Sequence, residues 1–145
     1  MKKLFALGFL LMKFQAHAQQ IKDTTFSVRG FTCQCKYNTI IEDKEDKNKI
    51  FYRAEESAYY PGGENEWNSF IEENLDTNLK GKKKIFSVEV IINKEGNLTY
   101  FRLADKAKKK KYEEALRLLK MSGKWFPAIQ NGYCVKSYHR IVFEF

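Results

Sequence analysis

Residues 85–103 read IFSVEVIINKEGNLTYFRL, and this stretch decides the fold. Residues 85–92 are mostly β-branched or aromatic and nearly apolar on both sides, which is typical of a central strand. The loop that follows contains Gly96, which can adopt the positive φ that a hairpin loop requires. Residues 98–103 then return as a second strand. The sequence therefore predicts a hairpin at the centre of the domain.

Helical periodicity flanks this hairpin on both sides. Before it, Glu64 and Glu66 open a segment with apolar residues on one helical face: Trp67, Phe70, Ile71 and Leu75. After it, a second segment shows the same spacing at Tyr112, Ala115, Leu116 and Leu119. Glu113 and Glu114 are expected at the start of this second helix, where the helix dipole favours acidic side chains.

Residues 135–145 read VKSYHRIVFEF and predict the last strand, because polar and apolar residues alternate along most of it. The order is then helix, strand, strand, helix, strand. Placing the third strand beside the first gives a split β-α-β unit with strand order 2-1-3. The prediction is an α+β fold with a three-stranded antiparallel or mixed sheet, two helices on one face and an N-terminal extension.

Residues 58–67 read AYYPGGENEW and mark the start of this domain. Pro61 and Gly62 suit the two central positions of a type II turn. We place an N-terminal extension at 19–56 and the folded domain at 57–145. Within the extension, residues 24–35 predict one short strand and residues 50–54 a possible edge strand.

The first 18 residues have the layout of a secretory signal peptide. A short basic start precedes the apolar residues 4–11, and Ala16-His17-Ala18 provides a cleavage site. An uncleaved anchor is the alternative, but the apolar run is short for a membrane span and Lys13 interrupts it. Cleavage would remove three lysines and lower the formal net charge from +8 to +5. The expected location is the periplasm.

The cysteines outside this leader are Cys33, Cys35 and Cys134. Export permits disulfides, and an odd number leaves one thiol over. On a strand, Cys33 and Cys35 would lie near the upper limit of the distance for bridging each other. A bridge from one of them to Cys134 is therefore favoured, with the connectivity left open.

Motifs for catalysis are scarce. His139 is expected to be a buried, hydrogen-bonded histidine rather than a catalytic one, because no nucleophile signature accompanies it. A weaker alternative is an enzyme that uses Cys134 and His139. A metal site at these two residues is disfavoured, since residues five apart on a strand point to opposite faces. Pairs such as Glu72-Glu73 and Glu113-Glu114 are expected on solvated helix surfaces. We predict no enzyme, no cofactor and no metal.

Several short motifs in this order resemble the TonB C-terminal domain family, in its bacteroidete form. They are Tyr60-Pro61-Gly62-Gly63-Glu64, the strand and loop at 88–96, the helix at 114–119, the KWFPA turn at 124–128 and Asn131-Gly132. The resemblance covers about residues 50–145. Residues 74–84 depart from it, because they lack the YPxxA element usual in the family.

The resemblance implies a periplasmic module that binds a short segment of an outer-membrane TonB-dependent receptor. That peptide would add as a strand to an open sheet edge. The expected edge is strand 135–145, with partner-binding residues Val135, Lys136, Tyr138, Arg140 and Val142. Nucleic acid is not an expected partner. The opposite expectation is that the extension, for instance residues 24–35, covers this edge.

The lysine clusters at 80–84 and 106–111 suggest a second function. A structural protein of the cell envelope could use them for weak contact with peptidoglycan or anionic lipid headgroups. In that case binding would fade as salt rises.

Overall fold

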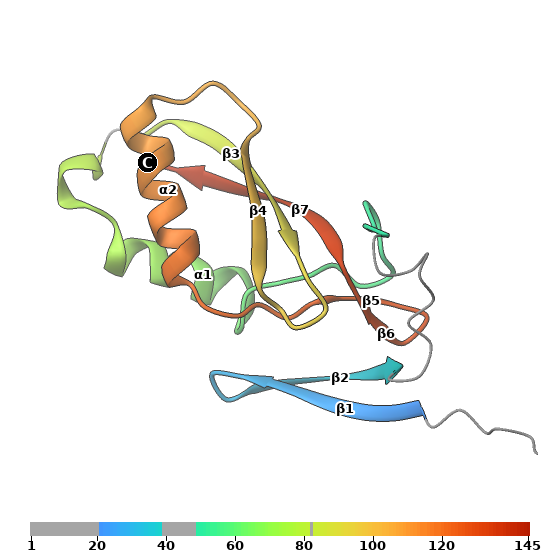
Figure 1. The fold of residues 1–145 in the computed structure, drawn as a ribbon. Helices are drawn as coiled ribbons and strands as arrows, with labels where there is room; N and C mark the ends of the chain where they lie inside the picture. The colour runs from blue at the N-terminus through green and yellow to red at the C-terminus, as the bar shows by residue number, and fades with distance from the viewer. Residues whose placement is uncertain (1–20, 39–48, 82) are drawn as a thin grey trace, which may run out of the picture.

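The computed structural model describes residues 21–38, 49–81 and 83–145. The predicted signal peptide at 1–18 lies outside these residues. Figure 1 shows the arrangement of the elements. They are β1 (Ile21–Val28), β2 (Phe31–Asn38), α1 (Gly63–Asn74), the 3-10 turn η1 (Thr77–Leu79), β3 (Ile85–Ile92), β4 (Leu98–Leu103), α2 (Lys109–Met121), β5 (Ala128–Gln130), β6 (Tyr133–Val135) and β7 (Ser137–Glu144).

The predicted central hairpin and α+β class are confirmed. Strands β4, β3 and β7 form a three-stranded antiparallel sheet in that order, with β3 in the middle. The loop between β3 and β4 closes with a hydrogen bond from the Gly96 N–H to the Asn93 carbonyl, at 3.0 Å. Gly96 has a φ of 79°, the positive value that the loop requires.

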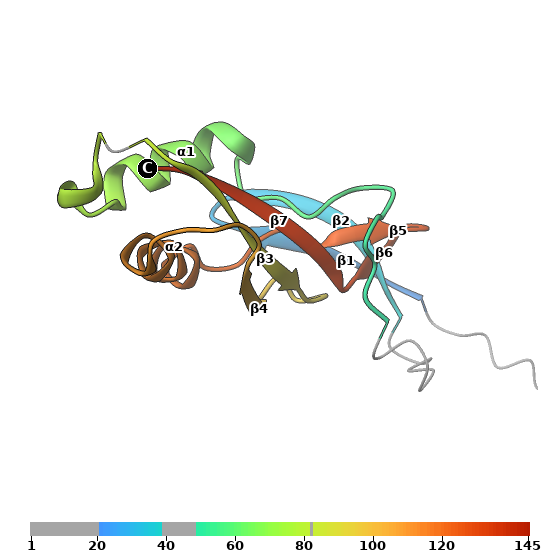
Figure 2. The same ribbon diagram turned by 90° about the horizontal axis from the view of Figure 1, so that it is seen from above.

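The core lies between this sheet and the helices (Figure 2). Alternate β3 side chains point into it, and all are almost fully buried: Phe86, Val88, Val90 and Ile92. Residues of α2 cover them: Ala115, Leu118 and Leu119. Trp67 of α1 joins the same cluster, with its ring centroid 5.9 Å from that of Phe143 on β7. Burial of this apolar surface is the main source of stability.

The turn before α1 has the predicted type II geometry. Gly62 has φ 87° and ψ −1°, and the Gly63 N–H donates to the Tyr60 carbonyl at 2.7 Å. Tyr60 and Trp67 are packing residues, as expected, with ring centroids 5.2 Å apart. The turn thus positions the rings of Tyr60 and Trp67 next to each other in the core.

Helix α2 differs from the prediction at its start. It begins at Lys109, so lysines occupy its first turn and Glu114 lies further along. Glu114 is also buried rather than solvated. Its carboxylate accepts hydrogen bonds from Arg117, at 2.6 and 2.8 Å, and from the Asp76 N–H at 2.9 Å. The contact with Asp76 joins the start of η1 to α2. The hydrogen bond from Arg117 holds the pKa of Glu114 below its usual value.

The N-terminal extension differs most from the prediction. Residues 24–35 do not form one strand, because the chain turns back at Arg29 and Gly30. Both residues have positive φ, 52° and 82°, which suits the tight hairpin between β1 and β2. Strand β2 then pairs in parallel with β6 at Lys36 and Tyr133. The result is a second sheet, in the order β1-β2-β6-β5, that the sequence did not predict.

Arg29 fastens the tip of this hairpin to the main core. Its guanidinium donates to the Tyr60 hydroxyl and to the Ser122 carbonyl, the latter at 3.0 Å. The guanidinium carbon also lies over the rings of Tyr60 and Phe70, at 5.2 and 5.7 Å from their centroids. The extension is therefore packed against the predicted domain.

Candidate functional site

Strand β7 is an edge strand of the central sheet, and its outer side is the candidate site. The predicted strand at 135–145 is divided in the structure, because the chain moves from one sheet to the other at Lys136. Val135 belongs to β6, where it is buried and pairs with Ala128. Val135 therefore does not lie on the expected edge, and Lys136 connects the two sheets.

The beginning of the β7 edge is already covered. The Phe51 N–H donates to the Lys136 carbonyl, and the Tyr138 N–H donates to the Phe51 carbonyl, both at 2.9 Å. The expectation that residues 24–35 cover this edge is wrong, because β2 pairs with β6 instead. The cover comes from the later part of the extension, around Phe51.

Among the described residues, none covers the remainder of the edge. Backbone groups of residues two apart on a strand point to the same side, so Arg140 and Val142 direct their N–H and C=O groups outward, as Tyr138 does. The odd-numbered residues face β3 instead, with which β7 pairs along its whole length. Within the described part of the chain, nothing hydrogen-bonds to the outward groups of Arg140 and Val142.

The side chains beside this edge lie on the sheet face that the helices leave uncovered. Val142 is 57% exposed there. Tyr138 has its ring centroid 5.4 Å from that of Tyr52, a highly exposed residue just after Phe51. Cross-strand pairing places Tyr138, Ile91 and Tyr100 in one row across the sheet. The open edge is thus bordered by an aromatic row at one end.

The next row across the sheet is charged, with Arg102 on β4, Glu89 on β3 and Arg140 on β7. One Glu89 oxygen accepts from Arg102, at 2.5 and 2.6 Å, and the other accepts from Arg140 at 3.2 Å. A hydrogen bond from the Tyr138 side chain and these two guanidinium groups hold the pKa of Glu89 below its usual value. Glu89 is therefore ionised at neutral pH, although its side chain is only 6% exposed.

Cys134 and His139 lie in different sheets, β6 and β7. Cys134 is buried opposite Ile129 and is disulfide-bonded. Cys33 and Cys35 lie on β2, the neighbour of β6, but their side chains are outside those described, so the pairing stays a proposal. A disulfide-bonded sulfur is no nucleophile, which removes support from an enzyme using Cys134. Among the described residues, no group of three His, Cys, Asp or Glu side chains could hold a metal ion.

His139 is partly buried, with its ring centroid 6.1 Å from that of Trp125. Burial holds its pKa below the usual value, so the folded protein keeps the ring neutral. The unfolded chain takes up the proton more readily. The stability that the neutral ring contributes is therefore complete above about pH 6.5 and is lost as the pH falls below that value.

We expect the His139→Gln variant to lose less stability than the wild type between about pH 7 and pH 5, since the variant has no imidazole to protonate. Urea denaturation at several pH values measures this difference. Parallel pH profiles for the two proteins would contradict the assignment.

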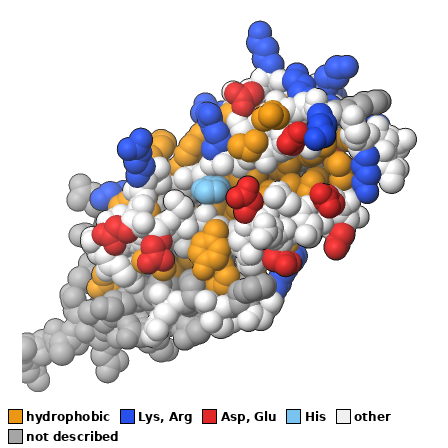
Figure 3. All heavy atoms as spheres, turned by 180° about the vertical axis from the view of Figure 1, so that it is seen from behind, with side chains coloured by type: hydrophobic (Ala, Val, Ile, Leu, Met, Phe, Trp, Pro, Cys, Tyr) orange, Lys and Arg blue, Asp and Glu red, His pale blue; other side chains and the backbone are white. Residues whose placement is uncertain are grey.

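The two lysine clusters are partly neutralised in the structure. Lys111 is buried and donates to the Phe145 carbonyl. Ion pairs engage other members: Lys83 with Glu144 at 3.5 Å, Lys109 with Glu113 at 3.8 Å and Lys110 with Asp76 at 3.9 Å. On the face drawn in Figure 3, acidic side chains lie among the basic ones.

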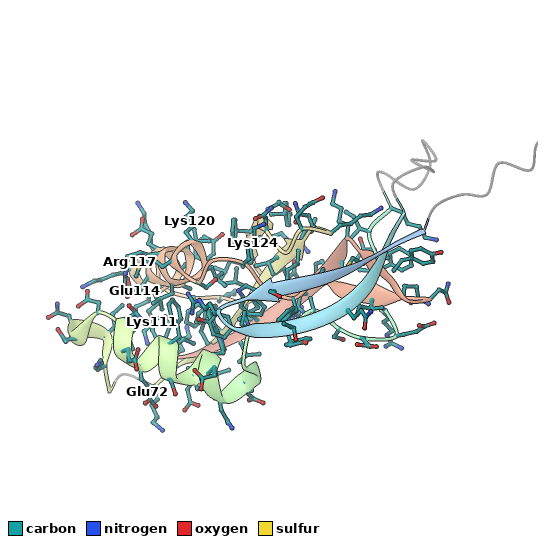
Figure 4. All side chains as sticks on the ribbon, turned by 90° about the horizontal axis from the view of Figure 1, so that it is seen from below. Glu72, Lys111, Glu114, Arg117, Lys120 and Lys124 are labelled. Atoms are coloured by element: carbon teal, nitrogen blue, oxygen red, sulfur yellow. The ribbon has the colours of Figure 1, made fainter. Side chains whose placement is uncertain are left out.

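A shallow hollow of about 300 Å³ lies between β4 and the end of α2. Leu98, Phe101 and Leu119 contribute apolar lining, and Lys120 and Lys124, both labelled in Figure 4, contribute basic groups. No carboxylate or histidine lines it. The hollow therefore offers no acid–base pair for catalysis.

No family model, curated protein or solved structure matches this chain. The likeness to TonB C-terminal domains therefore remains a resemblance of motifs. None of the helices within the described ranges is long and apolar enough to cross a membrane.

Proposed function

We propose that this protein is a periplasmic binding module that receives an extended peptide as an additional strand on the outer edge of β7. The observation that carries this proposal is that the outward backbone groups of Arg140 and Val142 have no hydrogen-bond partner among residues 21–38, 49–81 and 83–145. A peptide in extended conformation satisfies such groups with its own backbone, which is the basis of strand addition. The proposal involves no cofactor and no catalytic step.

The fold supports this reading. Strands β4 and β7 both run antiparallel to β3, and α2 lies between them in the chain, so the two form a split β-α-β unit. Both helices contribute side chains to the core that packs on the sheet. The motif residues Tyr60 and Trp125 pack together there, with ring centroids 5.5 Å apart.

The partner that we propose is a segment of an outer-membrane TonB-dependent receptor. This choice rests on the motif resemblance and on the proposed signal peptide. The site is short, because Phe51 occupies the edge beside Ser137 and the strand ends at Glu144. A short extended segment fits that length.

Amide hydrogen exchange tests the site. Adding a receptor-derived segment to the protein is expected to slow exchange at Arg140 and Val142, since their N–H groups gain acceptors. The neighbouring amides of Ile141 and Phe143 face β3 and serve as internal controls. Retention of TonB-dependent receptors from envelope extract by the immobilised protein is the parallel measurement. Unchanged exchange at Arg140 and Val142, together with no receptor enrichment, would contradict the proposal.

Contact with the envelope through the lysine clusters is the competing proposal. The structure offers it little support, because Lys111 is buried and several other lysines of these clusters have acidic partners. A charge-reversal test should leave Lys111 intact, since reversal of a buried charge would disturb folding whatever the function.

A further inference from the structure

We infer that the strand added to β7 carries an acidic side chain beside Arg140 and an apolar side chain beside Val142. This inference rests on the proposed function and specifies the class of peptide that the same site would select. The backbone of an added strand supplies affinity, whereas the side chains along its edge supply selectivity. The chemistry of the β7 residues therefore defines the preferred sequence.

Tyr138, Arg140, Val142 and Glu144 alternate along β7 and share one face of the sheet. Alternate residues of an added strand fall beside them on that same face, at the spacing of cross-strand neighbours. Tyr138 is already covered at its outer side by the segment around Phe51 and Tyr52. The side chains of the added peptide that β7 can discriminate are therefore those that lie beside Arg140, Val142 and Glu144.

Arg140 is suited to receive a carboxylate. Its guanidinium makes one long contact to Glu89, at 3.2 Å, and the side chain stays 55% exposed. The Glu89 carboxylate is held more closely by Arg102, which uses two nitrogens at 2.5 and 2.6 Å. Because a guanidinium carries five N–H donors, Arg140 keeps donors for a second acceptor beside the open edge.

The charges around Arg140 are formally balanced. Arg102 and Arg140 are cationic, whereas Glu89 and Asp105 are anionic. The hydrogen bond to Glu89 and, to a lesser extent, the nearby Asp105 carboxylate raise the pKa of Arg140. A bound carboxylate would therefore be selected by hydrogen-bond geometry at short range rather than by a broad positive field. A comparison of a carboxylate with its amide isostere in the peptide isolates that contribution.

Val142 and Glu144 of β7 further limit which side chains an added peptide can carry. Val142 is exposed and apolar, so an apolar side chain beside it would remove surface from water. Glu144 is anionic and only partly engaged by the exposed Lys83, at 3.5 Å. A second acidic residue beside Glu144 would be repelled, so the peptide pattern is acidic at one end and not at the other.

The experiment compares two synthetic peptides of about seven residues, rich in alternating valine and threonine. They differ only at one position, which is glutamate in one and glutamine in the other. Titrations followed by NMR give the dissociation constant of each for the wild-type protein, for Arg140→Gln and for Lys120→Gln. Lys120 is an exposed cation on α2 and controls for the loss of one positive charge. The NMR fingerprint of each variant shows that it is folded.

We expect the wild type and Lys120→Gln to bind the glutamate peptide about threefold to tenfold more tightly, and Arg140→Gln to bind both peptides equally. Equal binding of both peptides by the wild type would overturn the inference and leave the proposed function standing. A preference that persists in Arg140→Gln would overturn it as well. Absence of binding for both peptides would count against the strand-addition site itself.

Discussion

Replacement of Trp67 by alanine is expected to lower the free energy of unfolding by about 3–5 kcal/mol, a large part of the total for a domain of this size. Trp67 is 7% exposed and lies at the centre of an aromatic cluster. Its ring centroid is 5.1–5.9 Å from those of Tyr60, Phe70, Trp125 and Phe143. Alanine would leave a cavity between α1 and the sheet that these rings could fill only in part.

The Trp67→Phe variant is the matched control. Within the described structure, the Trp67 Nε1 has no hydrogen-bond partner, so phenylalanine removes no hydrogen bond and keeps an aromatic ring. We expect it to cost much less than alanine. Trp125 differs, because its Nε1 donates to the Ser122 hydroxyl at 2.9 Å. Urea denaturation measures the effects of both Trp67 variants, and a loss below about 1 kcal/mol for Trp67→Ala would refute the central position assigned to this residue.

Replacement of Val142 by proline is expected to weaken binding of an added strand more than tenfold. Proline has no N–H, so it deletes the outward donor on which strand addition depends. The same N–H takes no part in the pairing with β3, and proline is tolerated in edge strands where the N–H faces solvent. The fold should therefore survive with a modest loss of stability.

The Val142→Ala variant distinguishes the contribution of the backbone N–H to binding from that of the side chain. It removes most of the same apolar surface but keeps the N–H, so we expect only a few-fold loss of binding. NMR titration with the glutamate peptide gives both dissociation constants, and thermal denaturation reports folding. If the proline variant bound as tightly as the wild type, strand addition at Val142 would be ruled out.

Local pattern predicted the elements of the central sheet well. The β-branched run at 85–92, the glycine loop and the two helical stripes each carry their own periodicity, and each formed the expected element. Gly62 and Gly96 adopt positive φ at the two turns where the sequence required it. These features depend on residues close together in the chain, which is why the sequence alone shows them.

The candidate site was predicted less completely. Tyr138, Arg140 and Val142 do lie on the edge strand, because their alternation is a local property. Val135 does not, because it belongs to β6, which pairs with β5 in the second sheet. Glu89 could not be found from the sequence, since a lone acidic residue in an apolar strand gives no sign that two arginines from neighbouring strands will surround it. Nor does the sequence indicate that Tyr52 and Phe51 border the site.

The sequence by itself determined the class of the fold, the order of α1, β3, β4, α2 and β7, and the two main turns. Only the tertiary structure decided that the extension adds a hairpin to β6 and that Phe51 covers the start of β7. It also decided that no other described residue pairs with the outward backbone groups of Arg140 and Val142. The Arg-Gly pair at residues 29 and 30 was the one local sign of that hairpin. Backbone hydrogen bonds between strands are nearly the same for every residue type, so they do not specify which strands pair. The pairing of distant segments therefore depends on which strand edges the packed core leaves available.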